Sequence, residues 1–250
     1  AILFLKVYIY MNITIISNPK PDLDMGKMIC DTGLHQKLDE FELTKHFNQH
    51  SFNMLIGRPR SGKSSLAQGL FRSKKVFKNV FHKIVLFQPP NSRGSIKDDI
   101  FTKIPKEDIY DELTIKDLKA VIAQFKAQPE LNKAIILDDM GAYLKNNEIQ
   151  QLLKELVFNR RHLRVSIFVM AQSYKSLPLD LRKLVTNFII FKVSKMELNE
   201  IFNENIESLN GYTDEISKVV FDKPHQFLFA NIEDRKLYKN WDELLIKTNI

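Results

Sequence analysis

Residues 52–65 read Phe52-Asn-Met-Leu-Ile-Gly57-Arg-Pro-Arg-Ser-Gly62-Lys63-Ser64-Ser65, and they join three patterns. A short apolar strand pattern leads into G-x-x-x-x-G-K-S, and a helical pattern follows from Leu66 to Phe71. Glycines let the backbone curl so that successive N–H groups point at a phosphate, and the N-terminus of the next helix adds partial positive charge. This order predicts a P-loop, which binds the phosphates of a nucleotide.

The P-loop pattern also assigns a role to each kind of residue. Lys63 is expected to reach the β- and γ-phosphate oxygens of ATP, and the Ser64 hydroxyl is placed to ligate Mg²⁺. Arg58 and Arg60 are unusual charges within such a loop, and they either contact the nucleotide in cis or face solvent. The predicted nucleotide-binding residues are Gly57, Arg58, Pro59, Arg60, Ser61, Gly62, Lys63, Ser64 and Ser65.

A second informative stretch is Lys133-Ala-Ile-Ile-Leu-Asp138-Asp139-Met140. A continuous apolar run that ends in two acids indicates a central parallel strand whose carboxylates emerge at its carboxyl end. Ligands of open α/β sheets bind at that end, which is also where a P-loop lies. We therefore expect Asp138 to hold Mg²⁺ together with Ser64, and Asp139 to polarise the attacking water.

Two further segments flank the next strand pattern, Val165 to Ala171. Gln172 follows that strand, and it is predicted either to sense the γ-phosphate and order the lytic water or to be a simple turn residue. Arg160 and Arg161 precede the strand, at the end of the sheet opposite the chain's own nucleotide. They are arginine-finger candidates that would act on a neighbouring subunit, or else a solvated basic helix end.

Composition limits the class of protein. A chain of 250 residues with 44% hydrophobic content can bury the core of one domain. The formal charge of +7 suggests a polyanionic partner or ordinary solubility charge. A single cysteine, Cys30, excludes an internal disulfide framework and fits a reducing intracellular setting.

The first 50 residues are interpreted as an N-terminal extension, and residues 51–250 as the P-loop ATPase domain. Residues 1–10 are apolar but too short to span a bilayer, and they lack the features of a signal peptide, so neither a membrane span nor secretion is expected. They are an edge strand, or else sequence that is not native to the protein. A strand at Asn12 to Ser17 and a short helix at Leu34 to Phe47 are predicted within the extension.

The remaining elements follow from apolar periodicity and capping signals. Thr114 and Asp117 form a capping-box pattern at the start of a helix. Phe77 and Phe81 lie among lysines and either form a nucleic-acid surface or turn into the core. A hairpin near the C-terminus is expected to complete the sheet edge. The predicted ranges are strands 82–88 and 187–193, helices 114–128, 146–161, 177–185, 196–205 and 212–220, and hairpin strands 226–230 and 235–238.

Taken together, these motifs resemble one family. The segments G-R-P-R-S-G-K-S, I-I-L-D-D-M, N-R-R-H-L-R-V-S-I-F-V-M-A-Q-S and F-L-F-A-N-I-E-D-R-K-L-Y-K-N-W-D are similar to those of poxvirus-type genome-packaging ATPases. These belong with the FtsK/HerA translocases and occur in large DNA viruses of eukaryotes and in virophages. The similarity runs from about Phe52 to the C-terminus.

This resemblance implies an α/β fold, an additional-strand RecA-like P-loop NTPase with a three-layer sandwich around a mainly parallel sheet. It implies a homo-oligomeric ring, expected to be a hexamer, that hydrolyses ATP to drive double-stranded viral DNA into a capsid. Capsid proteins are then expected partners, and the protein would act at the viral assembly site in the host cytoplasm or in the virion. Many motors of this branch use glutamate where this chain has Asp139, so the chain departs from the pattern there.

Two other functions compete with a packaging motor. A small-molecule P-loop kinase shares the phosphate-binding loop, but such kinases usually carry an arginine-rich lid and lack a strand that ends in glutamine. A nucleotide-switched assembly protein would bind ATP tightly without turnover. Phosphoryl transfer to a nucleoside monophosphate, or binding without hydrolysis, would distinguish these alternatives from the motor.

Overall fold

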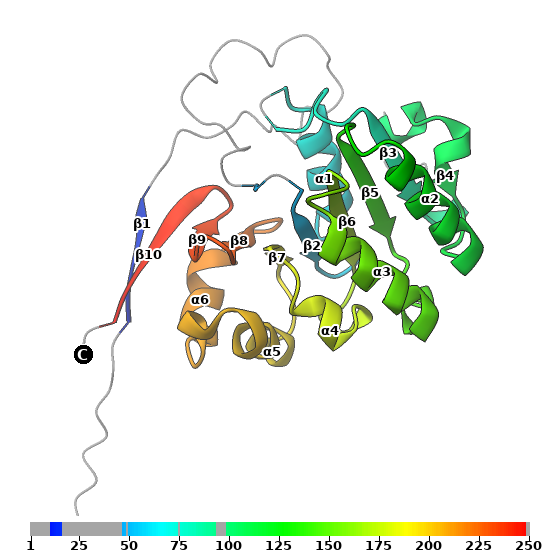
Figure 1. Ribbon diagram of the computed structural model, residues 1–250. Helices are drawn as coiled ribbons and strands as arrows, with labels where there is room; N and C mark the ends of the chain where they lie inside the picture. The colour runs from blue at the N-terminus through cyan, green and yellow to red at the C-terminus, as the bar shows by residue number, and fades with distance from the viewer. Residues whose placement is uncertain (1–10, 17–46, 49, 75, 94–98, 249–250) are drawn as a thin grey trace, which may run out of the picture.

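The computed structural model describes residues 11–16, 47–48, 50–74, 76–93 and 99–248. A single sheet runs through this part of the chain, in the order β1-β10-β9-β8-β7-β2-β6-β5-β3-β4 (Figure 1). Strands β7, β2, β6, β5, β3 and β4 are parallel, and β8, β9, β10 and β1 continue the sheet with antiparallel pairing. The strands are β1 (Met11–Ile16), β2 (Phe52–Ile56), β3 (Lys83–Phe87), β4 (Ile109–Tyr110), β5 (Lys133–Asp138), β6 (Val165–Ala171), β7 (Asn187–Phe191), β8 (Phe227–Asn231), β9 (Lys236–Lys239) and β10 (Asp242–Thr248).

Helices cover both faces of this sheet, which gives the expected three layers. Helix α1 lies on one face, and α2 and α3 lie side by side on the other (Figure 1). Successive side chains of a strand point to opposite faces of the sheet, and in β2 both faces are apolar. Met54 and Ile56 belong to one apolar cluster, and Leu55 belongs to a second cluster. The helices are α1 (Lys63–Arg72), α2 (Ile115–Ala127), α3 (Asn147–Asn159), α4 (Leu179–Arg182), α5 (Lys195–Asn205) and α6 (Thr213–Val220).

Side chains at the helix starts fix where several helices begin. The predicted N-cap forms at α2, where the Thr114 hydroxyl accepts from the Asp117 N–H at 3.1 Å. The Asp117 carboxylate accepts from this hydroxyl at 2.6 Å, and not from the Thr114 backbone N–H as in a full capping box. Asn146 caps α3, and Ser194 caps α5 through the Glu197 N–H at 3.2 Å. Local hydrogen bonds of this kind explain why the helix starts could be read from the sequence.

The antiparallel end of the sheet differs from the expectation. Strands β8 and β9 form the predicted hairpin, but they do not complete the sheet edge, because β10 pairs with β9 and β1 pairs with β10. The interpretation of the hairpin as the edge is therefore wrong. The sequence did not predict β10, because most of its length pairs with β1, more than 200 residues away, and only its first two residues pair with the neighbouring β9.

Phe77 and Phe81 belong to the core and not to an exposed surface. Phe77 is buried and Phe81 is half-buried, and both rings contact Phe168 of β6 at centroid distances of 5.3 and 6.3 Å. The core alternative is therefore confirmed. The predicted helix at Leu34 to Phe47, Cys30 and residues 1–10 lie outside the described residues, apart from Phe47 itself.

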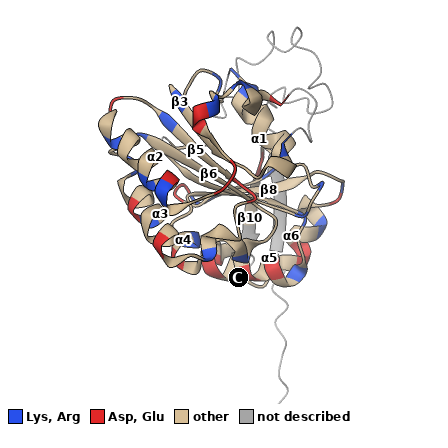
Figure 2. Ribbon diagram, turned by 90° about the vertical axis from the view of Figure 1, so that its right-hand side faces the viewer, with Lys and Arg blue, Asp and Glu red and all other residues tan. Residues whose placement is uncertain are grey.

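The surface of the helical layer mixes both signs of charge, as Figure 2 shows along α3, α4, α5 and α6. Lys154 of α3 pairs with Asp180 of α4, and Lys195 of α5 pairs with Asp214 of α6 at 2.6 Å. Exposed pairs of this kind contribute little stability. Among the described helices, none combines the length and apolar character needed to cross a membrane.

Candidate active site

Three neighbouring strand ends bring the predicted site residues together. β6 lies between β2 and β5, and the register pairs Ile56 with Ala171 and Asp138 with Met170. The Gly57 N–H donates to the Ala171 carbonyl at 3.2 Å, and the Asp139 N–H donates to the Met170 carbonyl at 3.0 Å. The P-loop, the two acids and Gln172 therefore meet at the carboxyl edge of the sheet, where parallel α/β sheets bind ligands.

The two P-loop glycines are required by geometry. A Cβ atom on Gly57 would lie 2.6 Å from the Ser61 Oγ and 2.7 Å from the Cβ of Phe191, so only glycine fits against β7 at that point. Gly62 has φ of +108°, a left-handed conformation that L side chains rarely adopt. Arg60 is also left-handed, with φ of 62°. The loop is therefore tightly curled, as phosphate binding requires.

The N-terminus of α1 differs from the starts of α2, α3 and α5. Those three helices are capped by Thr114, Asn146 and Ser194, whereas no side chain caps α1 and its first turn holds no acidic residue. The N–H groups of the first turn of a helix need partners from outside the helix. An uncapped, acid-free N-terminus next to the curled loop therefore fits an anionic ligand such as a phosphate.

Lys63 folds back over the loop at this helix start. Its Nζ donates to the carbonyl oxygens of Gly57 and Arg58, at 2.5 and 3.1 Å. Burial lowers the pKa of Lys63, while Asp138 and Asp139 oppose that shift. Arg58, Pro59 and Arg60 are exposed, and Ser61, Gly62, Ser64 and Ser65 are half-buried.

The two acids have different environments. Asp138 is buried, and its Oδ2 accepts from Gln88 Nε2 at 2.8 Å. Burial raises the pKa of Asp138, and the Gln88 hydrogen bond opposes this effect. Asp139 is exposed and left-handed, with φ of 57°. Gln172 Nε2 donates to both of its carboxylate oxygens, at 2.9 and 3.1 Å. The predicted pair of acid and sensor is therefore in direct contact.

The donor set at this edge suits Mg²⁺. Ser64 and Asp138 offer hard oxygen atoms, and Mg²⁺ binds through one or two such ligands together with waters and substrate phosphates. Within the described ranges, no group of three or more His, Cys, Asp or Glu side chains could hold a metal alone. A magnesium ion here would therefore depend on the phosphates of a bound nucleotide.

Arg160 and Arg161 lie at the other end of the sheet. They precede β6, and the 7 residues of this strand alone place the arginines about 20 Å from Gln172 at its other end. Glu233, in the turn between β8 and β9, accepts from Arg160 at 3.4 Å and from Arg161 at 3.1 Å. The Arg160 side chain is 14% exposed and the Arg161 side chain 68%. Neither arginine can reach the P-loop of its own chain.

Three residues near these sites were not found by sequence reasoning. Gln88 contacts Asp138, Glu233 pairs with both arginines, and His225 Nδ1 lies 3.1 Å from the Ser61 carbonyl oxygen of the P-loop. Gln88 had a signal, since it is a polar residue directly after an apolar strand pattern, as Gln172 is. Glu233 and His225 had none, because both lie in turns that only the folded sheet brings close.

The comparison with protein families gives one match. The model of the family described as Poxvirus A32 protein matches residues 39–222, which is most of the chain. The comparison with curated proteins gives no match.

Solved structures share the fold at low sequence identity. The chain is similar to the DNA-packaging ATPase B204 from Sulfolobus Turreted Icosahedral Virus, with 17% identity, a TM-score of 0.56, and coverage of 81% of this chain and 98% of that chain. The B204 genome packaging NTPase from Sulfolobus turreted icosahedral virus 2, in complex with ATP-gammaS, gives 16% identity, a TM-score of 0.54, and coverage of 81% and 98%. EssC (ATPases 2 and 3) from Geobacillus thermodenitrificans has 11% sequence identity and a TM-score of 0.52. The match covers 80% of this chain and 40% of that chain. These likenesses establish the P-loop ATPase fold.

Proposed function

The chain belongs to the Poxvirus A32 protein family, and we propose that it is a Mg²⁺-dependent ATPase that packages double-stranded viral DNA into capsids. The observation that carries this proposal is the convergence of the P-loop, Asp138, Asp139 and Gln172 on three adjacent strand ends. The B204 proteins, which share the fold, are described as genome-packaging enzymes, and one was solved with ATP-gammaS. Both facts support the proposal.

The residues of this edge divide the chemistry. The P-loop N–H groups and Lys63 would hold the β- and γ-phosphates, and Ser64 with Asp138 would hold Mg²⁺, which would supply positive charge to the phosphoryl group. The Asp139 carboxylate accepts the proton of the attacking water. Gln172 Nε2 donates to Asp139, so Gln172 would orient that carboxylate toward the attacking water.

The arginines require a second subunit. Because Arg160 and Arg161 lie at the opposite end of the sheet from their own P-loop, they can complete only the site of a neighbour. A head-to-tail contact of this kind gives a ring when the rotation between subunits closes, and we propose a closed hexamer. Arg161 is the better candidate for the finger, since its side chain is mostly exposed. Double-stranded DNA and viral capsid proteins are the proposed partners, at the viral assembly site in the host cytoplasm or in the virion.

ATP turnover with and without duplex DNA tests this function. We expect wild-type protein to hydrolyse ATP faster with DNA and to form nucleotide-dependent oligomers in analytical ultracentrifugation. Lys63→Ala should abolish both nucleotide binding and turnover. Lys126→Ala is a matched control, because that exposed lysine pairs with Glu155 away from the site.

Three outcomes would contradict the proposal. Hydrolysis at one rate with or without DNA by a protein that stays monomeric would exclude a packaging motor. Tight ATP binding without turnover would indicate a nucleotide-switched assembly protein. Phosphoryl transfer to a nucleoside monophosphate would indicate a kinase.

A further inference from the structure

Gln88 lies beside the proposed magnesium ligand, on the strand next to it. β3 pairs in parallel with β5, and the register aligns Phe87 with Leu137, so the residues that follow, Gln88 and Asp138, are neighbours. Gln88 is 4% exposed and Asp138 is 7% exposed. Gln88 Nε2 donates to Asp138 Oδ2 at 2.8 Å. A buried, charge-assisted hydrogen bond of this kind is among the stronger ones in proteins.

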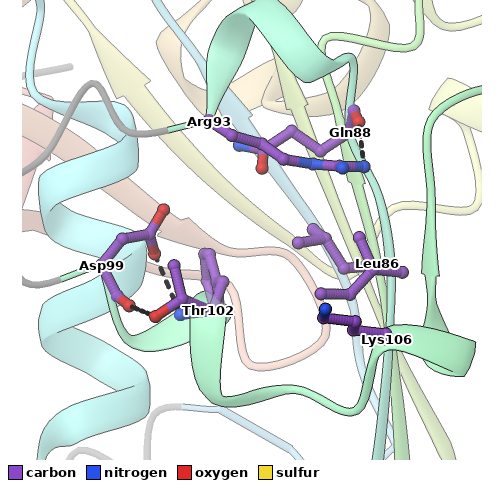
Figure 3. A pocket seen from close by; sticks show the side chains of 8 residues that line it. Leu86, Gln88, Arg93, Asp99, Thr102 and Lys106 are labelled. Atoms are coloured by element: carbon purple, nitrogen blue, oxygen red, sulfur yellow. Dashed lines mark hydrogen bonds between the residues drawn. The ribbon is translucent and has the colours of Figure 1, made fainter.

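The main chain of Gln88 is held on both sides. Its N–H donates to the Tyr110 carbonyl oxygen at 2.9 Å. Its own carbonyl oxygen accepts from Arg93 Nη2 at 2.9 Å, and Figure 3 shows this second bond. Arg93 in turn pairs with Asp111 at 2.5 Å. A cavity of about 370 Å³ borders Gln88 and Arg93 on the α1 side. These hydrogen bonds fix the main chain of Gln88 next to this cavity.

We propose that Gln88 is a positioning residue that orients the Asp138 carboxylate toward the Mg²⁺ of bound ATP. The bond engages Oδ2, which leaves Oδ1 to face the metal or its water. An amide carries no charge at any pH and offers a constant donor, so it fixes the carboxylate without competing for the metal. Hydrogen bonds to metal ligands orient those ligands and tune metal affinity. This inference rests on the proposed ATPase function.

The Gln88→Met variant tests this role because it keeps the side-chain length and removes the donor. We expect ATP-analogue binding in EDTA, measured by fluorescence, to stay within twofold of wild type, since the P-loop is intact. Mn²⁺ binding to the protein with nucleotide, followed by electron paramagnetic resonance, should weaken about tenfold. The Mg²⁺ concentration for half-maximal turnover should rise by a similar factor.

Gln150→Met is the matched control. Gln150 of α3 also donates one side-chain hydrogen bond, to the Leu144 carbonyl oxygen at 2.9 Å, and that bond involves neither Asp138 nor the P-loop. It should leave both metal measurements unchanged. In an Asp138→Asn background, adding Gln88→Met should change Mn²⁺ binding no further, because the two residues act through one bond.

Several outcomes would overturn the inference. Mn²⁺ affinity within twofold of wild type in a folded Gln88→Met protein would show that Gln88 is only a buried structural residue. Equal losses of Mn²⁺ affinity in Gln88→Met and Gln150→Met would also show that Gln88 has only a structural role. If Gln88→Met does not fold, Gln88→Asn keeps an amide that is too short for the bond, and it should weaken Mn²⁺ binding in the same direction. Absence of turnover in wild type would count against the ATPase function and not against the Gln88 contact, which the Mn²⁺ titration measures separately.

Discussion

The two ends of the parallel strands treat charge in opposite ways. At the carboxyl end, Asp138 is buried beside a neutral amide, so that its charge is costly to the fold. At the amino end, Arg160 and Arg161 share the carboxylate of Glu233, so that opposite charges meet. The carboxyl end therefore holds a buried carboxylate charge that a bound cation would offset, whereas at the amino end one carboxylate already offsets part of the charge of the two arginines. Removing a carboxylate charge should therefore raise the free energy of unfolding at the carboxyl end and lower it at the amino end.

The largest expected effect is at Asp139. Asp139→Asn should reduce ATP turnover by about 10³- to 10⁴-fold, because the amide cannot accept a proton from water. Nucleotide binding, measured by fluorescence titration, should remain near wild type. Asp180 is an exposed carboxylate that pairs with Lys154, and Asp180→Asn is the control. Its turnover should be unchanged. Undiminished turnover in Asp139→Asn would show that Asp139 does not accept the proton of the attacking water.

The next effect distinguishes the two arginines. Arg161→Ala should reduce turnover by about 10³-fold, as loss of an arginine finger does, without lowering the unfolding temperature. Arg160→Ala should mainly destabilise the fold, since its side chain is mostly buried and also donates to the Val157 carbonyl oxygen at 3.0 Å. Turnover of mixed wild-type and Arg161→Ala subunits should fall below the proportional value. Proportional turnover in the mixtures would mean that the amino end contributes nothing to a neighbour.

A smaller effect concerns stability at the carboxyl end. Burial raises the pKa of Asp138 above its unfolded value, so the folded state binds the proton more tightly, and the ionised carboxylate destabilises the fold at neutral pH. Asp138→Asn should therefore raise the free energy of unfolding by about 1 kcal/mol at pH 7. The gain should shrink as pH falls through the raised folded pKa and vanish below the unfolded pKa, where wild-type Asp138 is protonated in both states. Urea unfolding at pH 7 and pH 4 measures this, and a loss of stability at pH 7 would contradict the contrast between the ends.

The smallest effect is at Glu233. Glu233→Gln should lower the free energy of unfolding by about 0.5 kcal/mol at low salt, because two partly exposed ion pairs are lost. The loss should diminish in 1 M salt, which screens such pairs. Chemical denaturation at two salt concentrations gives the comparison. A salt-independent loss would indicate that the Asn48 contact of Glu233 carries the effect.

Much of the fold could be predicted from the sequence because its signals are local. Strands β2, β5 and β6 are continuous apolar runs, and the N-cap at Thr114 lies within four residues. The pairing of β1 with β10 could not be predicted, because it joins residues more than 200 positions apart and neither strand carries a turn that indicates its partner.

The candidate site divides in the same way. The P-loop, Asp138, Asp139 and Gln172 follow from the strand ends on which they lie, and the structure brings them together. Their catalytic roles remain predictions. Gln88 needed the strand order, since only the pairing of β3 with β5 makes it a neighbour of Asp138. Glu233 needed the position of the β8–β9 turn relative to α3, which no local pattern specifies.

The backbone at Asp139 also bears on how this site can change over evolution. Its φ of 57° is a conformation that aspartate, asparagine and glycine adopt more readily than residues with longer side chains. Exchange of Asp139 for glutamate would place a longer side chain on this strained backbone. The turn after β5 therefore favours aspartate at position 139. Glutamate would be tolerated there only with a compensating change in that turn.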